Sequence, residues 1–360
     1  MSSSSLRFLS GDGFTEPSGQ VITLGVGDQN FAAAAGDTVF AGAGNDTISA
    51  SLGGALIVGS TAASSTLYFS GGSSSPDTVA GGAGAETIIG GAAGGNFSGG
   101  ASGKNVLVSQ GASGSSTTLQ GAAGGTELFG AAQGNDTLIA GVGRETVLGG
   151  GGNTVIDGGA TTASVIFGGS DHTWYYGNGA SGDTIVGGTG YMSAKLNNGA
   201  AIFGGSGGVD VTGSTAGADS VVGGSGGMDY NGNGANSLIV ASDGATSLIS
   251  TGSGASLIFQ GTGITTVSSG AGSLEVITGK GNLTVYEGTG PAIYDVIKGD
   301  AGATDMITGF KPTADKLNLF GYQPSDISQT VSGGSTFLNL SDGTKIELVG
   351  VTNTGHSIIA

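Results

Sequence analysis

A repeat of about nine residues constrains the fold of this chain more than any other feature of its sequence. Across residues 134–169 a polar residue recurs at this spacing, and each is followed by a short run of threonine and branched apolar residues: Asp136, Glu145 and Asn153. Glycines flank every unit and favour tight turns, because glycine reaches positive φ angles at little steric cost. The repeat therefore predicts short strands between glycine turns, with one large side chain of each strand pointing inward.

One such unit cannot bury its apolar side alone, so copies of it must stack. We predict an all-β fold, a parallel β-solenoid of the β-roll type with about nine to ten residues per half-turn. The sequence divides into an entry segment (1–24) whose first strand is expected at 21–24, a glycine-rich solenoid (25–290) and a C-terminal cap (291–360). Two alternating segments in the cap, 336–340 and 345–349, flank an Asp-Gly pair, which is a strong hairpin signal.

Composition supports a folded, acidic protein. The chain has 79 glycines in 360 residues without a collagen triplet, and its 37% hydrophobic content lies in short β-branched runs that disordered chains lack. The net charge of −17 disfavours nucleic acid and anionic membrane surfaces as partners. No apolar run reaches 18 residues, so we expect no insertion into a membrane.

The polar units resemble a known family. Residues 42–48 (Gly-Ala-Gly-Asn-Asp-Thr-Ile) and 134–138 (Gly-Asn-Asp-Thr-Leu) are similar to the calcium-binding nonapeptide of the RTX family. The resemblance implies that turn carbonyls and the carboxylates of stacked turns hold Ca²⁺, a cation that prefers oxygen ligands. The acids that match the motif, and are therefore the predicted metal ligands, are Asp37, Asp46, Asp77, Glu86, Asp136, Glu145, Asp183 and Asp219.

Three pairs of these acids lie nine residues apart, so that neighbouring turns each bring a carboxylate: Asp37 with Asp46, Asp77 with Glu86, and Asp136 with Glu145. We expect the first pair to be the best calcium site. Where the acid is replaced, as at Asn153 or Ser247, the turn can persist without a carboxylate ligand.

The C-terminal part is similar to the segment that closes the roll in type I secreted RTX proteins, over residues 305–310 and 315–319. The hairpin after it resembles the uncleaved export signal of that family. The resemblance implies export by a type I secretion apparatus and a secreted or cell-surface location. A plain C-terminal cap is the structural interpretation of the same hairpin, and the two are compatible.

Trp174, Tyr175 and Tyr176 concentrate large aromatic residues, including the sole tryptophan, in a chain of small ones. They are candidate binding or interface residues, because aromatic residues dominate recognition surfaces. The other interpretation is that they fill a wider turn and pack beneath it.

The sequence gives little sign of catalysis. It lacks the His-Glu-x-x-His pattern of zinc proteases, and its two histidines lie far apart. Paired acids in open, wet turns suit a cation better than general acid–base chemistry. We therefore predict that the protein is not an enzyme.

The predicted function is structural: a calcium-stabilised, secreted solenoid that associates with copies of itself into an extracellular layer, fibre or biofilm matrix. One alternative is an adhesin that uses the aromatic stretch. Another is an ice-binding protein, which is disfavoured because its threonines, such as Thr47, Thr87 and Thr137, follow the acid instead of forming a regular outward pair.

Overall fold

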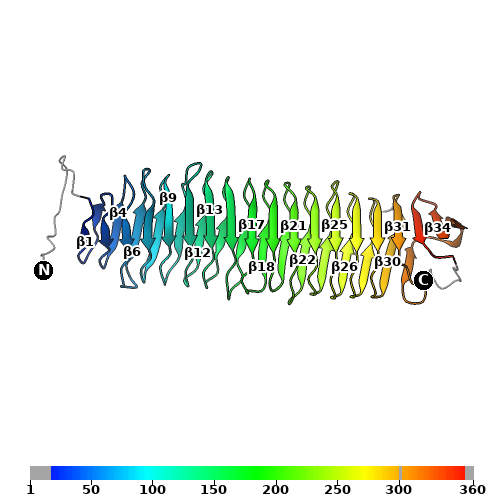
Figure 1. The fold of residues 1–360 in the computed structure, drawn as a ribbon. Helices are drawn as coiled ribbons and strands as arrows, with labels where there is room; N and C mark the ends of the chain where they lie inside the picture. The colour runs from blue at the N-terminus through cyan, green and yellow to red at the C-terminus, as the bar shows by residue number, and fades with distance from the viewer. Residues whose placement is uncertain (1–17, 300–301, 353–360) are drawn as a thin grey trace. The chain divides into compact units, whose positions relative to one another are not determined.

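The computed structural model of the protein describes residues 18–299 and 302–352. The chain divides into two compact units, residues 1–183 and 184–360, and the fold of each is a parallel β-solenoid. Consecutive strands alternate between two sheets (Figure 1). A residue meets its counterpart on the next rung about 19 residues later, which confirms the predicted half-turn of nine to ten residues. No helix in the described part of the chain is long and apolar enough to cross a membrane.

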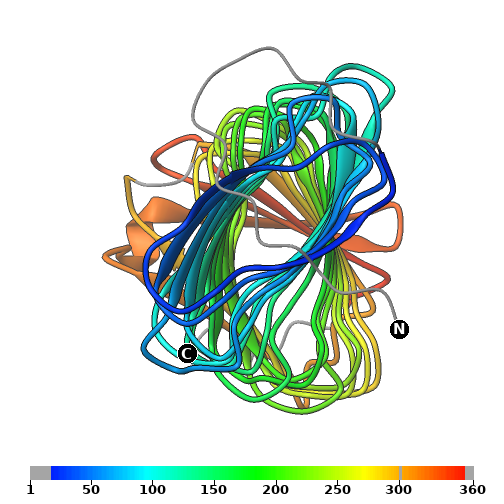
Figure 2. The same ribbon diagram turned by 90° about the vertical axis from the view of Figure 1, so that its left-hand side faces the viewer.

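The sheet that contains the odd-numbered strands is called sheet A, and it also includes β34; the sheet of the even-numbered strands β2 to β32 is called sheet B. In the first unit, sheet A consists of β1 (Val21–Thr23), β3 (Thr38–Phe40), β5 (Leu56–Val58), β7 (Asp77–Ala80), β9 (Gly94–Ser98), β11 (Ser116–Gln120), β13 (Asn135–Ile139), β15 (Asn153–Asp157) and β17 (Thr173–Tyr176). Sheet B consists of β2 (Asn30–Ala32), β4 (Asn45–Ser49), β6 (Thr66–Ser70), β8 (Ala85–Ile89), β10 (Asn105–Val108), β12 (Thr126–Phe129), β14 (Thr146–Leu148) and β16 (Val165–Phe167). The next strand, β18 (Asp183–Val186), begins at the last residue of this unit. Figure 2 looks along the stack of rungs, with the blue strands of this unit nearest the viewer.

The core of the first unit is two columns of large side chains, one from each sheet. Side chains alternate along a short strand, so one large residue per strand points inward. These residues are at most 2% exposed: Val39, Ile57, Val79, Phe97, Leu119, Leu138, Ile156 and Tyr175 in sheet A, and Ile48, Phe69, Ile88, Leu107, Leu128, Val147 and Ile166 in sheet B. Full burial of one such side chain contributes about 1.5–3 kcal/mol, so each rung is stabilised by stacking on its neighbours.

Close contact between turns explains the abundance of glycine. A Cβ atom added at Gly84 would lie 1.8 Å from the carbonyl oxygen of Ser65, and one added at Gly150 would lie 1.8 Å from that of Ala131. These distances are far below any van der Waals contact. The turns of successive rungs therefore pack backbone against backbone, which only glycine permits.

The second unit repeats this arrangement. Its sheet A contains β19 (Met192–Lys195), β21 (Val209–Thr212), β23 (Met228–Asn231), β25 (Ser247–Ser250), β27 (Thr265–Ser268), β29 (Leu283–Tyr286), β31 (Thr304–Thr308), β35 (Lys345–Val349), β34 (Ser335–Leu340) and β33 (Ile327–Ser332). Its sheet B contains β20 (Ala200–Phe203), β22 (Asp219–Val222), β24 (Ser237–Val240), β26 (Ser256–Phe259), β28 (Leu274–Ile277), β30 (Ala292–Ile297) and β32 (Lys316–Phe320). A short 3₁₀ helix, η1 (Pro324–Asp326), precedes β33.

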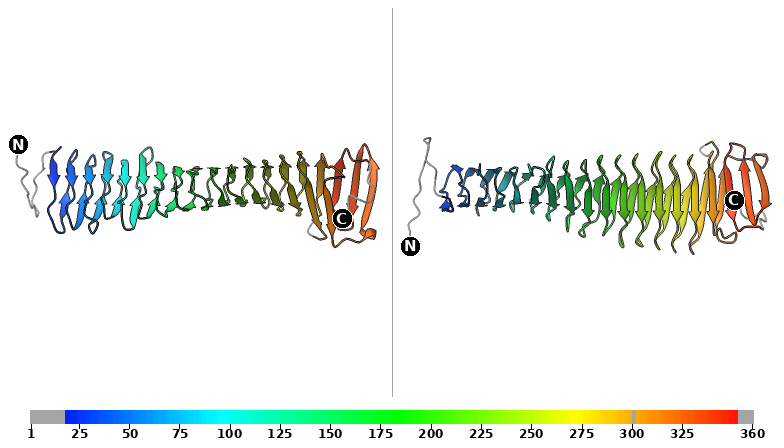
Figure 3. Two further views of the ribbon diagram at one scale, coloured as in Figure 1. Left: turned by 90° about the horizontal axis from the view of Figure 1, so that it is seen from below. Right: turned by 45° about the horizontal axis from the view of Figure 1, so that its top comes forward.

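Antiparallel strands close the second unit (Figure 3, orange to red). β35 pairs in parallel with β31, and β34 pairs antiparallel with both β35 and β33. The predicted hairpin at 336–349 is thus confirmed, whereas β33 was not predicted. Its signal was present in Gly333 and Gly334, whose φ angles of 60° and 86° suit a two-residue hairpin turn.

The predicted entry segment is described only from residue 18 onward. Its first strand, expected at 21–24, is β1. The rest of that segment lies outside the described residues.

Candidate functional site

All eight predicted metal ligands occupy one kind of position in the coil. It is the inward-facing position two residues before the core residue of a strand, where the turn enters the strand, and we call it the corner position. Asp37 precedes the core residue Val39 in this way, and Asp46 precedes Ile48. The eight side chains are buried, with exposed fractions between 1% and 4%. The acids are therefore internal groups of the coil and do not line open, wet turns as the sequence suggested.

The structure does not bring the nine-residue pairs together. Asp37 enters β3 of sheet A, whereas Asp46 lies in β4 of sheet B. Because consecutive strands belong to different sheets, their corner positions lie at opposite edges of the coil. The same separation applies to Asp77 with Glu86 and to Asp136 with Glu145.

Stacked corner positions do not pair acids either. Asp136 lies in register with Thr117 on one side and Thr154 on the other. Asp77 is in register with Gly95, and Glu86 with Leu67. The nearest acids of a column are thus two rungs apart, about 9.6 Å at the usual strand spacing, whereas calcium ligands lie about 2.3–2.6 Å from the ion. Among the described residues no group of three His, Cys, Asp or Glu side chains could hold a metal ion.

These corner carboxylates accept backbone hydrogen bonds instead. Oδ2 of Asp77 accepts from the N–H of Gly72 in its own turn at 2.9 Å, and Oδ1 accepts from the N–H of Ala55 on the preceding rung at 3.0 Å. Asp46 repeats the pattern with the N–H groups of Gly42 (2.8 Å) and Gln29 (3.1 Å). A carboxylate with this arrangement ties its own turn to the adjacent one, and its oxygens already face donors. The corner acids therefore do not fit a site at which two stacked carboxylates share a calcium ion.

Neutral side chains perform the same task where the acid is absent. Oδ1 of Asn105 accepts from the N–H groups of Glu86 (2.9 Å) and Gly100 (3.1 Å). The hydroxyl oxygen of Thr173 accepts from the N–H of Gly169 at 3.0 Å, and that of Ser247 from the N–H of Ser242 at 2.9 Å. Sequence reasoning missed these residues because it looked for carboxylates. The usable signal is any side-chain acceptor placed four or five residues after the small residue that starts the turn.

Burial raises the pKa of three carboxyls, and two of them also have oxygens without a hydrogen-bond partner among the described residues. Burial raises the pKa of Glu145 to about 7 and that of Asp305 to about 7. Within the described residues, Oε1 of Glu145 and both carboxylate oxygens of Asp305 have no hydrogen-bond partner. Burial likewise raises the pKa of Glu287 to about 7, although Tyr294 (2.6 Å) and Lys311 (2.9 Å) both donate to it. These carboxyls therefore carry a proton over part of the neutral pH range, and the stability of the coil should depend on their ionisation.

The aromatic stretch is divided between core and surface. Tyr175 is 1% exposed and belongs to the core column of sheet A, and its hydroxyl donates a hydrogen bond to Asp183. Burial and this hydrogen bond raise the pKa of Tyr175. Trp174 and Tyr176 point outward from β17, and Tyr176 is 46% exposed. The Trp174 ring stacks on His172, with centroids 3.8 Å apart and planes 6° from parallel.

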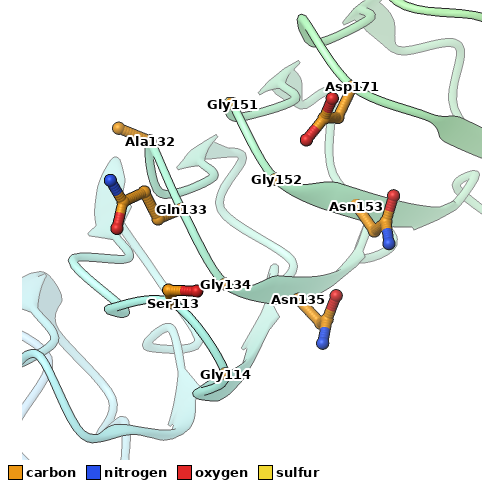
Figure 4. A pocket seen from close by; sticks show the side chains of 10 residues that line it. All are labelled: Ser113, Gly114, Ala132, Gln133, Gly134, Asn135, Gly151, Gly152, Asn153 and Asp171. Atoms are coloured by element: carbon orange, nitrogen blue, oxygen red, sulfur yellow. The ribbon is translucent and has the colours of Figure 1, made fainter.

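A shallow polar groove of about 360 Å³ lies over the turns of the same unit (Figure 4). Its side chains include Asn135 and Asn153, which lie side by side in register on neighbouring rungs, and Asp171 beyond them. Glycines and backbone form most of the remaining wall. With a single carboxylate in its lining, the groove has no acid pair for proton transfer or for cation binding.

No model of a known protein family matches the sequence, and a search of curated proteins found no significant match. The function is therefore argued from the residues and geometry above.

Proposed function

We propose that this protein is structural: a β-solenoid that associates with copies of itself in an extracellular layer, fibre or matrix. One observation carries the proposal. The described residues of both units are almost entirely stacked rungs of short strands, tied together by buried corner side chains. Among the described residues no group of three His, Cys, Asp or Glu side chains could hold a metal ion, and the groove over residues 113–171 is shallow. A chain that uses its length in this way is suited to a mechanical or packing role.

Exposed strand edges support self-association. In β33 every residue except Ile327 is exposed, and among the described residues β33 pairs with β34 alone. In the first unit, β1 pairs with β3 and exposes 68% of Val21. An edge strand presents unpaired N–H and C=O groups, which a strand of another copy can pair with. Such heterologous contacts need not close on themselves, so they can extend.

The proposed extracellular location rests on composition and on the hairpin. The repeats are acidic and poor in lysine, as in secreted acidic proteins, and the hairpin formed by β34 and β35 lies where a type I export signal is expected from the RTX resemblance. We propose that the type I secretion apparatus recognises this end of the chain. Deleting residues 327–360 should abolish export from cells that carry such an apparatus, whereas deleting one whole rung should not.

A concentration series tests the main proposal. Purified protein is examined by sedimentation velocity and negative-stain imaging from micromolar to near-millimolar concentration, with calcium and with chelator. We expect the sedimentation coefficient to rise with concentration and extended assemblies to appear. Monomers at every concentration, in both conditions, would contradict a self-associating role.

Calcium stabilisation stays a prediction, and the corner geometry sharpens its test. A ligand that binds only the folded state raises its stability. Calcium bound by corner carboxylates should therefore raise the melting temperature of the parent protein more than that of the double variant Asp46→Asn, Asp136→Asn. Equal melting temperatures with calcium and with chelator in the parent protein would remove calcium from the proposal.

A second candidate function is adhesion through the aromatic surface of β17. The observation that favours it is the outward Trp174 ring stacked on His172, next to the 46% exposed Tyr176. Trp174→Ala should then abolish attachment to cell-surface glycans and leave self-association unchanged. Attachment that survives this substitution would exclude the aromatic surface as the adhesive site.

A further inference from the structure

An apolar stripe runs along the outer face of sheet B in both units. In the first unit the register aligns five outward residues on consecutive rungs: Ile89, Val108, Phe129, Leu148 and Phe167. In the second unit it aligns Phe203, Val222, Val240, Phe259 and Ile277. All ten are half-buried or exposed, and the exposed fractions of Phe167, Phe203 and Phe259 are 39%, 45% and 36%. These ten residues are called the apolar stripe.

In the second unit the equivalent outward column of sheet A is mostly polar. On consecutive rungs it reads Lys195, Thr212, Asn231, Ser250, Ser268 and Tyr286. In the first unit this column is mixed, because it contains polar residues (Ser98, Gln120, Asp157) as well as Phe40, Val58, Ala80, Ile139 and Tyr176. The coil geometry is the same on both sheets, so it does not require apolar residues at this position. In the second unit the apolar residues align on one face only, which is typical of a surface that is covered.

We propose that the apolar stripe packs against the same stripe of a second copy of this chain, sheet B against sheet B. Residues of the stripe repeat at the strand spacing of about 4.8 Å, and a second copy presents apolar residues at this same spacing. Two sheets packed face to face interdigitate their side chains at a separation of about 10 Å. Such a contact is isologous, since each copy contributes the same patch.

Electrostatic repulsion between two copies favours contact through the outer face of sheet B. The net charge of −17 makes two copies repel each other, and this repulsion is smallest where neither copy presents charged groups. The stripe has no charged residue, and the neighbouring outward column adds one acid in each unit over these rungs, Glu127 and Glu275. By contrast, Asp210 and Asp229 lie in register on the outer face of sheet A.

The size of the stripe predicts a weak contact. Five rungs extend over about 24 Å, and two outward columns are about 13 Å wide, so each unit offers roughly 300 Å². A stable interface buries about 800 Å² per partner. Association through the stripe of one unit should therefore be weak and need high concentration, and it should strengthen when several copies are already held together. The inference rests on the proposed self-association and names the face that carries it.

Matched triple variants test the face. One carries Phe167→Lys, Phe203→Lys and Phe259→Lys on sheet B, and the control carries Phe40→Lys, Tyr176→Lys and Tyr286→Lys at similarly exposed positions of sheet A. Both reduce the net negative charge equally, so a general charge effect would favour association in both. Sedimentation velocity should show the sheet B variant as a monomer at concentrations at least tenfold above those at which the parent and the control associate.

A second measurement covers the case in which the triple variant does not fold, which far-ultraviolet circular dichroism would reveal. The chain has no cysteine, so a solvent-sensitive dye can be placed at Phe203→Cys or, as control, at Tyr286→Cys. The dye emission should shift to the blue with rising protein concentration only at the first position.

The outcomes are distinguishable. Unchanged association in the sheet B variant, or equal loss in both variants, overturns the proposed face but leaves self-association standing. A monomeric parent at every concentration overturns both proposals. A dye shift at Phe203→Cys that requires neutral lipid vesicles would assign the stripe to a lipid surface and overturn the pairing of copies.

Discussion

The corner positions of the two units use different chemistry to hold the same coil. In the first unit they are mostly polar, and seven are acids: Asp37, Asp46, Asp77, Glu86, Asp136, Glu145 and Asp183. In the second unit three are acids, Asp219, Asp305 and Asp315, and Met192, Val209 and Met228 fill three consecutive rungs of one column. Parallel register and a buried core column occur in both. A carboxylate at the corner is therefore one way to close a turn, and an apolar side chain is another.

Polar and apolar corners are destabilised by different changes. A corner acid must be compensated by N–H donors, because burial of an ionised group is costly. An apolar corner gains from burial and needs no donor for its side chain, and its backbone N–H bonds to a carbonyl on the next rung, as that of a polar corner such as Asp219 also does. Val209 donates in this way to Gly227 at 2.9 Å, and Met228 to Thr246 at 3.1 Å. We expect polar corners to respond to pH and apolar corners to respond to volume.

The largest expected effect comes from placing an acid in an apolar corner. Met228→Asp buries a carboxylate beside Val209, at a site built for a thioether, and should lower the free energy of unfolding of the local rungs by about 4–5 kcal/mol. Hydrogen exchange of the amides in β23 measures this change. Ser247→Asp on the next rung is the matched control, because the Ser242 N–H already faces its side chain. Equal losses in the two variants would refute the distinction between corner types.

Removing an acid from a polar corner should have the next largest effect. Asp77→Ala leaves the N–H groups of Gly72 and Ala55 without an acceptor and should cost about 3–4 kcal/mol. Asp77→Asn should cost about 1 kcal/mol or less, because Asn105 occupies a comparable corner with two N–H donors. Denaturant unfolding followed by circular dichroism compares the two. An asparagine variant as unstable as the alanine variant would show that the charge itself is required.

The pH dependence should be smaller and opposite to that of an ordinary paired acid. Burial raises the folded-state pKa of Glu145 to about 7 from its usual 4.5, so the folded protein binds this proton more tightly than the unfolded chain. Its contribution to stability is complete below pH 4.5, declines as the pH rises to about 7, and stays lost above that. The change amounts to at most about 3 kcal/mol.

Glu145→Gln should flatten this part of the stability curve, and Asp305→Asn should do the same in the second unit, where burial also raises the pKa to about 7. Thermal melting between pH 4 and 8 measures both. A parent protein that becomes more stable across this range would contradict the burial of these groups.

Local rules predicted the strands well. Glycine turns and threonine-led apolar pairs specified short strands, the alternation of faces specified the inward residue, and the Asp-Gly pair placed the hairpin of β34 and β35. These features depend on a few neighbouring residues. Which residues become neighbours on adjacent rungs does not depend on local sequence alone. The neighbour of Asp136 is Thr117, 19 residues earlier, whereas Glu145, nine residues later, belongs to the other sheet. A nine-residue repeat reveals the half-turn but not which corner each half-turn occupies.

Contacts between rungs, which local rules do not predict, also determine the roles of the corner side chains and of the aromatic stretch. Ser247 was interpreted as a position where the acid is lost, and Asn105 and Thr173 were not considered, because only the stacked geometry shows that each side chain meets an N–H. Tyr175 looked equivalent to its neighbours, yet strand alternation turns it into the core and leaves Trp174 and Tyr176 outside. β33 was missed because its sequence, Ile-Ser-Gln-Thr-Val-Ser, is mostly polar and buries no residue, so its conformation depends on pairing with β34.

Because a corner acid such as Asp77 bonds only to its own turn and the one before, a rung depends on no partner farther away. Removing residues 117–135 would place Asp136 where Thr117 stands, beside Gly95. The side-chain hydrogen bonds lost at this corner would be those of Ser109 with Thr117 and Asp136 and that of Asp136 with the Ala131 N–H, which lies in the removed segment. A gene that encodes such a coil can gain or lose whole rungs by recombination between its repeats. The number of rungs, and with it the length of the coil, can then change during evolution while the fold stays the same.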